Sequence, residues 1–337
     1  MTKLGIETGR LRSVAAITAI GTYVPERRLT NADLEQMVDT SDEWIVQRTG
    51  IRERRIAAEN EYASDLAYRA VEDLMNRTGA AVHDVDYVIV ATSTPDTIFP
   101  SVAARVQAQF HIASCGTVDL QAACAGFTAG LQLANALLLT GIYRKILIIG
   151  VDALTKITDY TDRTTCILFG DGAGAVLMAP AKDGEGQIIA AYSDTDGELG
   201  HHVYMSHLSP AIGEVDISTN GKLVQNGREV YRWAVSRVSA GVLKLLEAGG
   251  LRPEEIDWFV PHNANQRIID AVAERVGFAP EQALSSIALY GNTSAASIPL
   301  ALHDAVKDGR VRSGHNLLLH GFGGGLTQAG VILRWSL

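Results

Sequence analysis

Apolar residues along this chain fall into short continuous runs and longer stretches with helical spacing. The runs at 86–90 and 145–150 begin at a charged residue and predict buried strands. Residues 125–140 contain no proline, place Ala, Leu and Gln at helix-compatible positions and stop before Gly141, which suits a left-handed helix cap. The sequence therefore predicts strands that alternate with a long, apolar helix.

The second half of the chain repeats this order. Strand-like runs at 257–260 and 316–321 resemble the first two, and residues 298–306 predict a second apolar helix. We therefore expect an α/β fold of two similar halves, residues 1–182 and 183–337. Because the helices are so apolar, we expect mostly parallel sheets and layers that are buried on both sides.

Composition narrows the class of protein. The chain has 337 residues, of which 47% are hydrophobic and 20% charged, as expected for a compact enzyme with a large core. A net charge of −9 without a long basic run argues against nucleic acid as the main partner. Its three cysteines form no CxxC pair and leave one over, which argues against a disulfide framework or a zinc site. No apolar run is long enough to predict a membrane span, so we expect a soluble cytoplasmic protein.

Cys124 stands where an extended run, 118–120, gives way to the apolar helix. Free N–H groups and the positive end of the helix dipole at such a corner favour a thiolate over a thiol, and a thiolate is a nucleophile. The alternative is that Cys124 is only a small hydrophobic residue among alanines.

Three further features follow predicted strands or corners. His262 comes directly after a strand run and Pro261, although a lone histidine can equally cap a helix or bind a loop carbonyl. Asn292 alone is as easily an N-cap. The run 321–325 is either a flexible turn or backbone that offers an N–H group to a ligand. Ligands bind at the carboxyl ends of strands in open α/β sheets, so we expect these features and Cys124 to share one cavity.

A cysteine, a histidine, an asparagine and backbone N–H donors together make an acyl-transfer site. With these residues, nearly the whole chain resembles the β-ketoacyl-[acyl-carrier-protein] synthase III family, the initiating condensing enzymes of fatty acid synthesis. The motifs that carry the resemblance are Thr40-Ser41-Asp42-Glu43-Trp44-Ile45, Arg48-Thr49-Gly50-Ile51, Ala123-Cys124-Ala125-Gly126-Phe127, His262-Asn263-Ala264-Asn265 and Tyr290-Gly291-Asn292-Thr293-Ser294.

The resemblance implies a thiolase-like fold, with two similar halves in a five-layer α-β-α-β-α arrangement, and a homodimer. It implies that Cys124, His262 and Asn292 are catalytic, with the backbone N–H groups of Cys124 and Gly324 holding the oxyanion. In related elongating synthases the cysteine works with two histidines, and thiolases add a second cysteine. Asn292 at the third position is typical of the initiating class.

The same resemblance implies the reaction. Cys124 attacks the thioester of a short-chain acyl-CoA, CoA leaves, and an acyl-Cys124 remains. Malonyl-acyl carrier protein (malonyl-ACP) then loses carbon dioxide, and His262 and Asn292 stabilise the enolate that attacks the acyl group. CoA is thus part of a substrate, and no permanently bound cofactor or metal is expected.

Further site residues also follow from the resemblance. Those expected at the CoA arm are Trp44, Arg48, Arg163, Asn265, Tyr231, Ala234 and Ile268. Those expected at the acyl chamber are Leu154, Phe169, Leu223, Phe322 and, from the partner subunit, Phe99. Those expected to receive the acidic acyl carrier protein are Arg228, Arg232, Arg267 and Arg275. Arg228 departs from the family, because many members hold Asn there.

Three alternatives stay open at this point. A condensing-type acyltransferase of natural-product biosynthesis would keep Cys124 without needing malonyl decarboxylation, whereas His262 and Asn292 together favour decarboxylation. A cysteine hydrolase also uses Cys, His and Asn, but the local cysteine signature of papain-like proteases is absent. A non-catalytic subunit of a condensing complex would usually lack the nucleophile. The sequence does not decide which primer acyl group is used.

Overall fold

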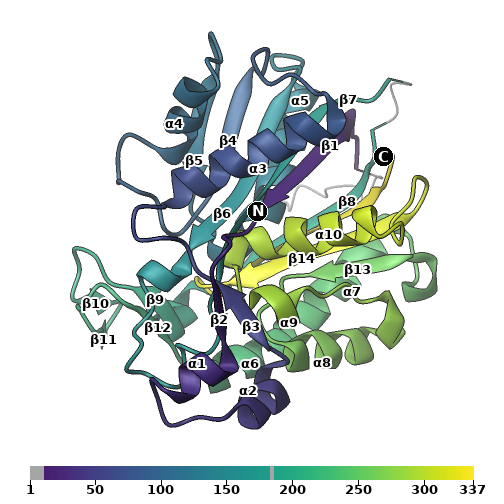
Figure 1. Cartoon of the computed structure of the whole chain (residues 1–337). Helices are drawn as coiled ribbons and strands as arrows, with labels where there is room; N and C mark the ends of the chain where they lie inside the picture. Colours follow the sequence, from purple (N-terminus) through teal and green to yellow (C-terminus); the bar gives the residue numbers. More distant parts are fainter. Residues whose placement is uncertain (1–10, 183–185) are drawn as a thin grey trace.

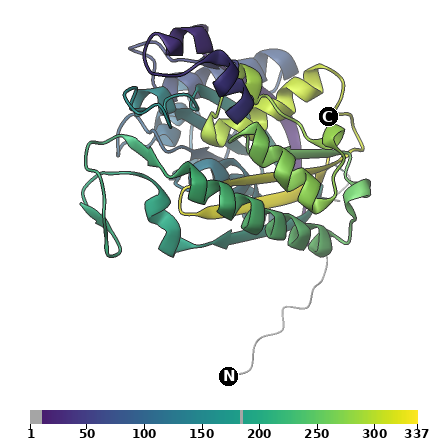
Figure 2. The same ribbon diagram turned by 90° about the horizontal axis from the view of Figure 1, so that it is seen from below.

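The computed structural model describes residues 11–182 and 186–337, and its helices and strands form five layers (Figure 1). Two central sheets face each other across a middle layer of helices, and a helical layer covers the outer face of each sheet. A view from below shows helices of the second half side by side in front of its sheet (Figure 2). The expected thiolase-like five-layer arrangement is confirmed.

The first sheet has five strands in the order β1-β7-β6-β4-β5. Its strands are β1 (Ala15–Tyr23), β4 (Tyr87–Ala91), β5 (Gly116–Leu120), β6 (Ile146–Ala153) and β7 (Asp171–Pro180). The second sheet has four strands in the order β13-β14-β15-β8. Its strands are β8 (Ile188–Thr195), β13 (Trp258–Pro261), β14 (Asn316–Gly323) and β15 (Thr327–Arg334).

The internal repeat predicted from the sequence is present in the topology. In the first sheet β4 pairs with β6 in parallel, β6 with β7 antiparallel, and β7 with β1 antiparallel. The second sheet repeats this order: β13 pairs with β14 in parallel, β14 with β15 antiparallel, and β15 with β8 antiparallel. The expectation of mostly parallel sheets is wrong, however, because no α-helix carries the chain from β6 to β7 or from β14 to β15 within the described residues. Without such a crossover, each second strand returns antiparallel.

The helices divide among the three helical layers. Those against the outer face of the first sheet are α3 (Ala63–Thr78) and α4 (Val102–Gln109). Those between the sheets are α5 (Gly126–Leu139) and α10 (Ser297–Lys307). Those against the outer face of the second sheet are α7 (Ser239–Gly249) and α8 (Gln266–Val276).

The side chains of β6 point alternately to the two faces of the sheet, and both faces are buried. Ile146 and Ile148 point to the middle layer, whereas Leu147, Ile149 and Val151 pack against α3 and α4. All five side chains are fully buried. A continuous apolar run is therefore what a strand between two helical layers requires.

Two insertions lie at the cavity end of the layers. The first contains β2 (Arg28–Thr30), α1 (Asn31–Glu35), α2 (Asp42–Thr49) and β3 (Glu53–Arg55). The second contains β9 (Val203–Met205), β10 (Ala211–Ile212), β11 (Val215–Asp216), β12 (Leu223–Gln225) and α6 (Gly227–Trp233). The short helix α9 (Ile287–Tyr290) precedes α10. The sequence pattern did not predict the small strands of the second insertion, which project from the body in Figure 1.

The division at residues 182 and 183 stays a prediction. Strand β7 ends at Pro180 and β8 begins at Ile188, and residues 183–185 of this connection lie outside the described residues. Over the described part of the chain, no helix is long and apolar enough to cross a membrane.

Candidate active site

Cys124 lies in a short 3-10 turn, Ala123–Ala125, between β5 and the first residue of α5. The turn begins with Ala123 in the left-handed region, at φ +44°. The end of β14 passes directly beside the cysteine: a Cβ atom on Gly323 would lie 2.9 Å from Cys124 Sγ. Only glycine fits there, so the Gly-rich run after β14 is a point of close backbone approach between the two halves.

His262 directly follows β13 and is buried. Its Nδ1 lies 2.7 Å from Ser297 Oγ, and this oxygen also accepts the backbone N–H of Asn263 at 3.2 Å. The hydroxyl proton is then free to be donated to Nδ1, which places the imidazole proton on Nε2. The ring also packs edge-on against Phe322, with 5.2 Å between the ring centroids.

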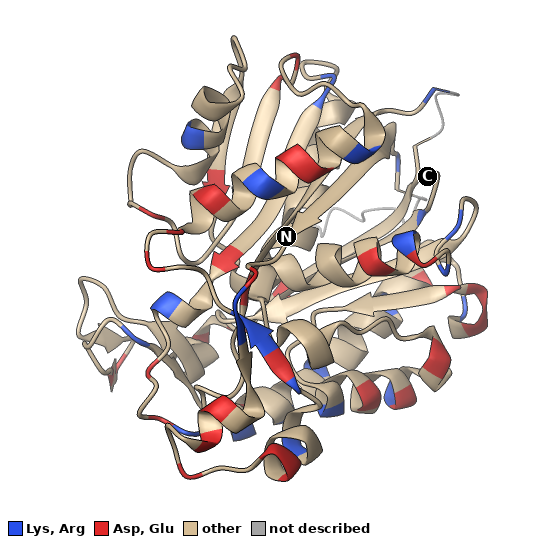
Figure 3. Cartoon of the chain, in the orientation of Figure 1, with Lys and Arg blue, Asp and Glu red and all other residues tan. Residues whose placement is uncertain are grey.

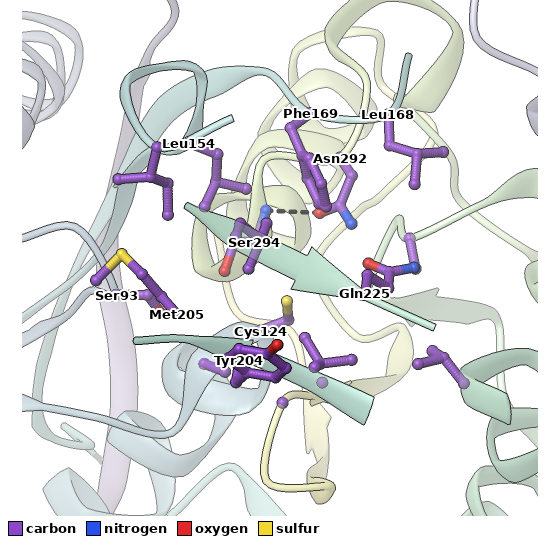
Figure 4. Close-up of a pocket in the computed structure, with 18 of the residues that line it drawn as sticks. Ser93, Cys124, Leu154, Leu168, Phe169, Tyr204, Met205, Gln225, Asn292 and Ser294 are labelled. Atoms are coloured by element: carbon purple, nitrogen blue, oxygen red, sulfur yellow. Dashed lines mark hydrogen bonds between the residues drawn. The ribbon is translucent and has the colours of Figure 1, made fainter. Parts of the chain in front are cut away.

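Asn292 is held by backbone and side chain alike. Its N–H donates to the carbonyl of Leu168 at 2.8 Å, and its carbonyl accepts the N–H of Gly170 at 3.0 Å. Its side-chain oxygen accepts the N–H of Ser294 at 2.9 Å, the bond drawn in Figure 4. With the oxygen occupied, the amide nitrogen is the end that faces the cavity, so Asn292 is oriented as a donor.

The three residues line one cavity of about 1860 Å³, as the sequence predicted. The predicted residues that also line it are Trp44, Arg48, Leu154, Phe169, Leu223, Arg228, Tyr231, Arg232, Asn265, Arg267, Ile268, Phe322 and Gly324. Their elements come from both halves and both insertions. Figure 4 shows Cys124 and Ser294 facing each other across this cavity, with Asn292 and Phe169 above them.

Four predicted residues do not line the cavity of a single chain. Ala234 is fully buried in the core behind α6, which places it out of reach of a ligand and corrects that expectation. Arg163 lies outside the cavity on the Trp44 ring, Arg275 is exposed in the last turn of α8, and Phe99 is exposed. The assignments of Arg163, Arg275 and Phe99 stay predictions.

At the mouth of the cavity, two guanidinium groups lie close to one aromatic ring. Arg48 and Arg163 lie 5.9 and 5.6 Å from the centroid of the Trp44 ring. Arg163 also donates to the carboxylate of Asp39 at 3.0 Å. A planar group that entered between Arg163 and Trp44 would take over a stacking position that the arginine now occupies.

Protonation of the site differs from the sequence expectation. Burial raises the pKa of the Cys124 thiol to about 12, and burial lowers the pKa of His262 to about 3. Both shifts favour a neutral thiol and a neutral imidazole in the resting site, in the opposite direction to the thiolate expected from the helix end.

Several cavity residues were missed by the sequence analysis. Ser93, Ser294, Met205 and Gln225 all line the cavity, and each comes from a segment without a distinctive chemical pattern. Ser294 was quoted within a motif, and its position two residues after Asn292 was the available signal. Among the described residues, no group of three or more His, Cys, Asp or Glu side chains is arranged to hold a metal ion.

Sequence models of a known family match both halves of this chain. The model described as 3-oxoacyl-[acyl-carrier-protein (ACP)] synthase III matches residues 118–197, and the model of its C-terminal part matches residues 246–335. Beta-ketoacyl-[acyl-carrier-protein] synthase III 2 of Halalkalibacterium halodurans is 54% identical over 325 residues, covering 96% of this chain and 98% of the relative.

Solved structures agree with these matches. The crystal structure of beta-ketoacyl-[acyl carrier protein] synthase III from Thermus thermophilus has 48% identity and a TM-score of 0.92, covering 95% of this chain and 99% of that one. The priming β-ketosynthase of the R1128 polyketide pathway has 33% identity and a TM-score of 0.88, covering 96% and 97%. The chain therefore belongs to the 3-oxoacyl-[acyl-carrier-protein] synthase III family.

Proposed function

We propose that this protein condenses a short-chain acyl-CoA with malonyl-ACP, with loss of carbon dioxide, to give a β-ketoacyl-ACP that starts fatty acid synthesis. The observation that carries the proposal is the orientation of three side chains in one cavity. Cys124 stands at the end of α5, while His262 and Asn292 each have one end fixed and a donor end left for a ligand. Family membership supports the same reaction.

In the first half-reaction, the sulfur of Cys124 attacks the thioester carbonyl of the primer. The N–H groups of Cys124 and Gly324 are suited to hold the resulting oxyanion, because both residues line the cavity at the contact between the halves. Collapse of the tetrahedral intermediate breaks the bond to the CoA sulfur. CoA leaves as a thiol, and acyl-Cys124 remains.

In the second half-reaction, Nε2–H of His262 and the amide of Asn292 donate to the thioester oxygen of malonyl-ACP. Donors already aimed at the position of developing charge stabilise the enolate as carbon dioxide departs. The enolate carbon then attacks the acyl group on Cys124, and the sulfur leaves. A neutral imidazole with its proton on Nε2 can make this donation, and burial, which lowers the pKa of His262, favours the neutral ring.

The CoA arm would enter at the mouth. Trp44 and Arg163 would stack on the adenine, with Arg48 beside the phosphates, and Asn265, Tyr231 and Ile268 would contact the pantetheine. The guanidinium carbon of Arg163 lies 5.6 Å from the centroid of the Trp44 ring. An adenine stacked between the two groups would need a separation of roughly 7 Å. Arg163 would therefore move outward from Asp39 as the adenine enters.

The acyl group of the primer would lie among Leu154, Phe169, Leu223 and Phe322. We further propose that two copies pair along the open edge of β5, the outermost strand of its sheet. Beside this edge Phe99 is 83% exposed, and the neighbouring Ile98 lines the cavity. Pairing would bring Phe99 of the partner subunit to the end of the acyl chamber, which limits primers to about five carbons.

Acyl carrier protein is acidic, so it would dock on basic side chains at the mouth. Arg228, Arg232 and Arg267 are exposed and line the cavity, and Arg275 continues the surface along α8. Figure 3 shows that α8 carries both signs of charge, because Asp270 and Glu274 share it with the arginines. Arg267 and the two arginines of α6 are therefore the main expected contacts.

The competing cysteine hydrolase interpretation has less support. Papain-like enzymes work through a thiolate and an imidazolium, whereas here burial raises the pKa of the Cys124 thiol and lowers the pKa of His262, so it disfavours both charged forms. All three described cysteines are unpaired, which fits the reducing cytoplasm where we expect the protein to act.

Intact-mass measurement after incubation with acetyl-CoA tests the proposal. The wild-type protein and the control Cys115→Ala should gain one acetyl group, and addition of malonyl-ACP should discharge it as acetoacetyl-ACP. Cys124→Ser should gain none, because a serine hydroxyl is a weaker nucleophile and gives up its proton far less readily than a thiol. Release of free acetate without malonyl-ACP, in place of a stable acyl-protein, would favour the hydrolase instead.

A further inference from the structure

A fully buried arginine lies behind the part of the cavity wall that carries Asn292. Arg54 is the middle residue of β3 in the first insertion, and none of its surface is exposed. Its Nε donates to the backbone carbonyl of Ile167 at 3.0 Å, and one of its terminal nitrogens donates to the same oxygen. The other terminal nitrogen donates to the side-chain oxygen of Asn31 at 2.6 Å. Over residues 11–182 and 186–337, no Asp or Glu forms an ion pair with this guanidinium.

A buried cation without a carboxylate partner costs free energy. Burial lowers the pKa of Arg54 to about 10, so the group is still charged at neutral pH. An apolar side chain of similar volume would often serve stability as well. A guanidinium differs from such a side chain in its planar set of N–H groups, which can bind one carbonyl from two nitrogens and a second acceptor at the same time. The role of Arg54 therefore lies in what these N–H groups hold.

Asn31 fixes the orientation of the guanidinium. It is buried, and its amide nitrogen donates to the carboxylate of Asp42 at 2.7 Å and to the carbonyl of Ile51 at 2.8 Å. With both amide hydrogens in use, its oxygen is the end that faces Arg54. The arginine is thus held in one position from the side of the first insertion.

The carbonyl that Arg54 binds belongs to the segment 167–170, which supports the backbone of Asn292. The N–H of Asn292 donates to the Leu168 carbonyl, and the Asn292 carbonyl accepts the N–H of Gly170. These two bonds form a short parallel bridge between Asn292 and Phe169, and Figure 4 shows the two side chains next to each other. The position of Asn292 in the cavity therefore depends on the position of the segment 167–170.

The apolar stem of Arg54 packs against both chain segments of this bridge. A Cβ atom on Gly291 would lie 3.0 Å from Arg54 Cγ, and a Cβ atom on Gly170 would lie 3.3 Å from Arg54 Cβ. Gly291 directly precedes Asn292 and is in the left-handed region at φ +66°. Arg54 thus contacts the chain on both sides of the bonds that hold Asn292, and its head binds one of these segments.

We propose that Arg54 is a positioning residue for Asn292, and that it keeps the Asn292 amide aimed at the thioester oxygen of malonyl-ACP during decarboxylation. Arg54 does not belong to the described residues that line the cavity, so it acts on the reaction only through the segments that it holds. A donor to developing charge loses much of its effect when it is displaced by about 1 Å. This inference rests on the proposed use of Asn292 in decarboxylation.

Replacing Arg54 by Lys keeps the charge and most of the apolar stem. A single ammonium, however, cannot bind Ile167 and Asn31 with the same geometry. With acetyl-CoA present, Arg54→Lys should slow the release of radiolabelled carbon dioxide from malonyl-ACP by about tenfold, because the Asn292 amide is loosened but not removed. Formation of acyl-Cys124 from acetyl-CoA, measured by intact mass, should change by less than about twofold.

The same substitution in an Asn292→Ala background separates positioning from general destabilisation. If Arg54 acts through the Asn292 amide, Arg54→Lys should cause almost no further loss of carbon dioxide release once that amide is gone. The proposal would be overturned by an equal loss in both backgrounds, by an unchanged rate in Arg54→Lys, or by loss of acylation equal to that of decarboxylation.

Asn135→Ala is the matched control. Asn135 is a buried polar residue of α5, and its side-chain oxygen accepts the Ser13 hydroxyl at 2.7 Å. Its replacement should lower the midpoint of thermal unfolding and leave carbon dioxide release near the wild-type rate. A loss of activity as large as in Arg54→Lys would show that the effect follows stability, and would overturn the proposal.

If Arg54→Lys does not fold, Asn31→Ala decides. This variant keeps Arg54 but frees one side of its guanidinium, so it should slow carbon dioxide release in the otherwise wild-type protein and not in the Asn292→Ala background. An unchanged rate, or an equal loss in both backgrounds, would overturn the proposal. Failure of the wild-type protein itself to release carbon dioxide is a separate outcome, which would contradict the proposed function.

Discussion

The hydroxyl of Ser297 lies 2.7 Å from Nδ1 of His262, while the same oxygen accepts the backbone N–H of Asn263 at 3.2 Å. Ser297 is the first residue of α10, and His262 follows β13, so the contact joins the middle layer to the second sheet. A Ser297 hydroxyl that donates to Nδ1 leaves the imidazole proton on Nε2. Without it, either nitrogen is free to hold the proton and the ring loses its fixed donor end.

Replacing Ser297 by Ala should lower the rate of malonyl-ACP decarboxylation by about tenfold, the value of one hydrogen bond of ~1.4 kcal/mol. Acylation of Cys124 should change little, because His262 is not needed as a base there. Nitrogen NMR of labelled His262 should show a mixture of tautomers. Ser239→Ala is the control, since this buried serine donates to the Val235 carbonyl far from the site. Equal loss of both half-reactions would contradict this role.

His262→Ala and Asn292→Ala should each reduce decarboxylation by about 10²-fold or more, as expected for removal of one donor to a developing oxyanion. Acyl-Cys124 should still form from acetyl-CoA in both variants. Separate assays of carbon dioxide release and of acyl-protein mass measure the two steps. If acylation fell as far as decarboxylation in both, His262 would be acting as the base for Cys124.

Phe99→Thr should admit longer acyl-CoA primers and lower the rate with acetyl-CoA, because a smaller side chain leaves a deeper chamber. Each methylene contact is worth only about 1–3 kcal/mol, so the preference should shift gradually with chain length. Rates across a series of straight-chain acyl-CoAs measure the shift, and analytical ultracentrifugation checks the oligomeric state. An unchanged preference in an intact dimer would show that Phe99 does not close the chamber.

Acid should destabilise the fold through two buried histidines. Burial lowers the pKa of His262 to about 3 and of His320 to about 4, against about 6.5 in the unfolded chain. The unfolded state therefore binds more protons, and the free energy of unfolding falls as pH drops from about 6.5 toward 4. Asp171, whose pKa burial raises to about 6, opposes this slope because its contribution is present at low pH and lost as pH rises.

His262→Gln should make the free energy of unfolding depend less steeply on pH between pH 4.5 and 6. The slope should fall by the contribution of one proton, about 1.4 kcal/mol per pH unit. Urea unfolding at several pH values measures it, and the effect of Asp171 cancels because both proteins contain it. A wild-type slope in His262→Gln would mean that the imidazole is already charged in the folded state.

Much of the fold was readable from the sequence because its layers depend on simple periodicities. Continuous apolar runs predicted β4, β6, β13 and β14, and the helix at 125–140 corresponds to α5, with Gly141 in the left-handed region at φ +72°. The repeat between the halves followed from the order of these elements. Strand direction did not follow, because the link from β6 to β7 has no long helix to reveal a parallel return.

The sequence by itself determined the chemical types at the site, Cys124, His262 and Asn292, and the corners at which they stand. The tertiary structure decided what each can do. Ser297 and the Ser294 N–H hold two of them with a donor end toward the cavity, and burial raises the pKa of the Cys124 thiol. These properties arise between residues far apart in the chain, and solvation and hydrogen-bond direction depend on the packed neighbours that only the fold assembles.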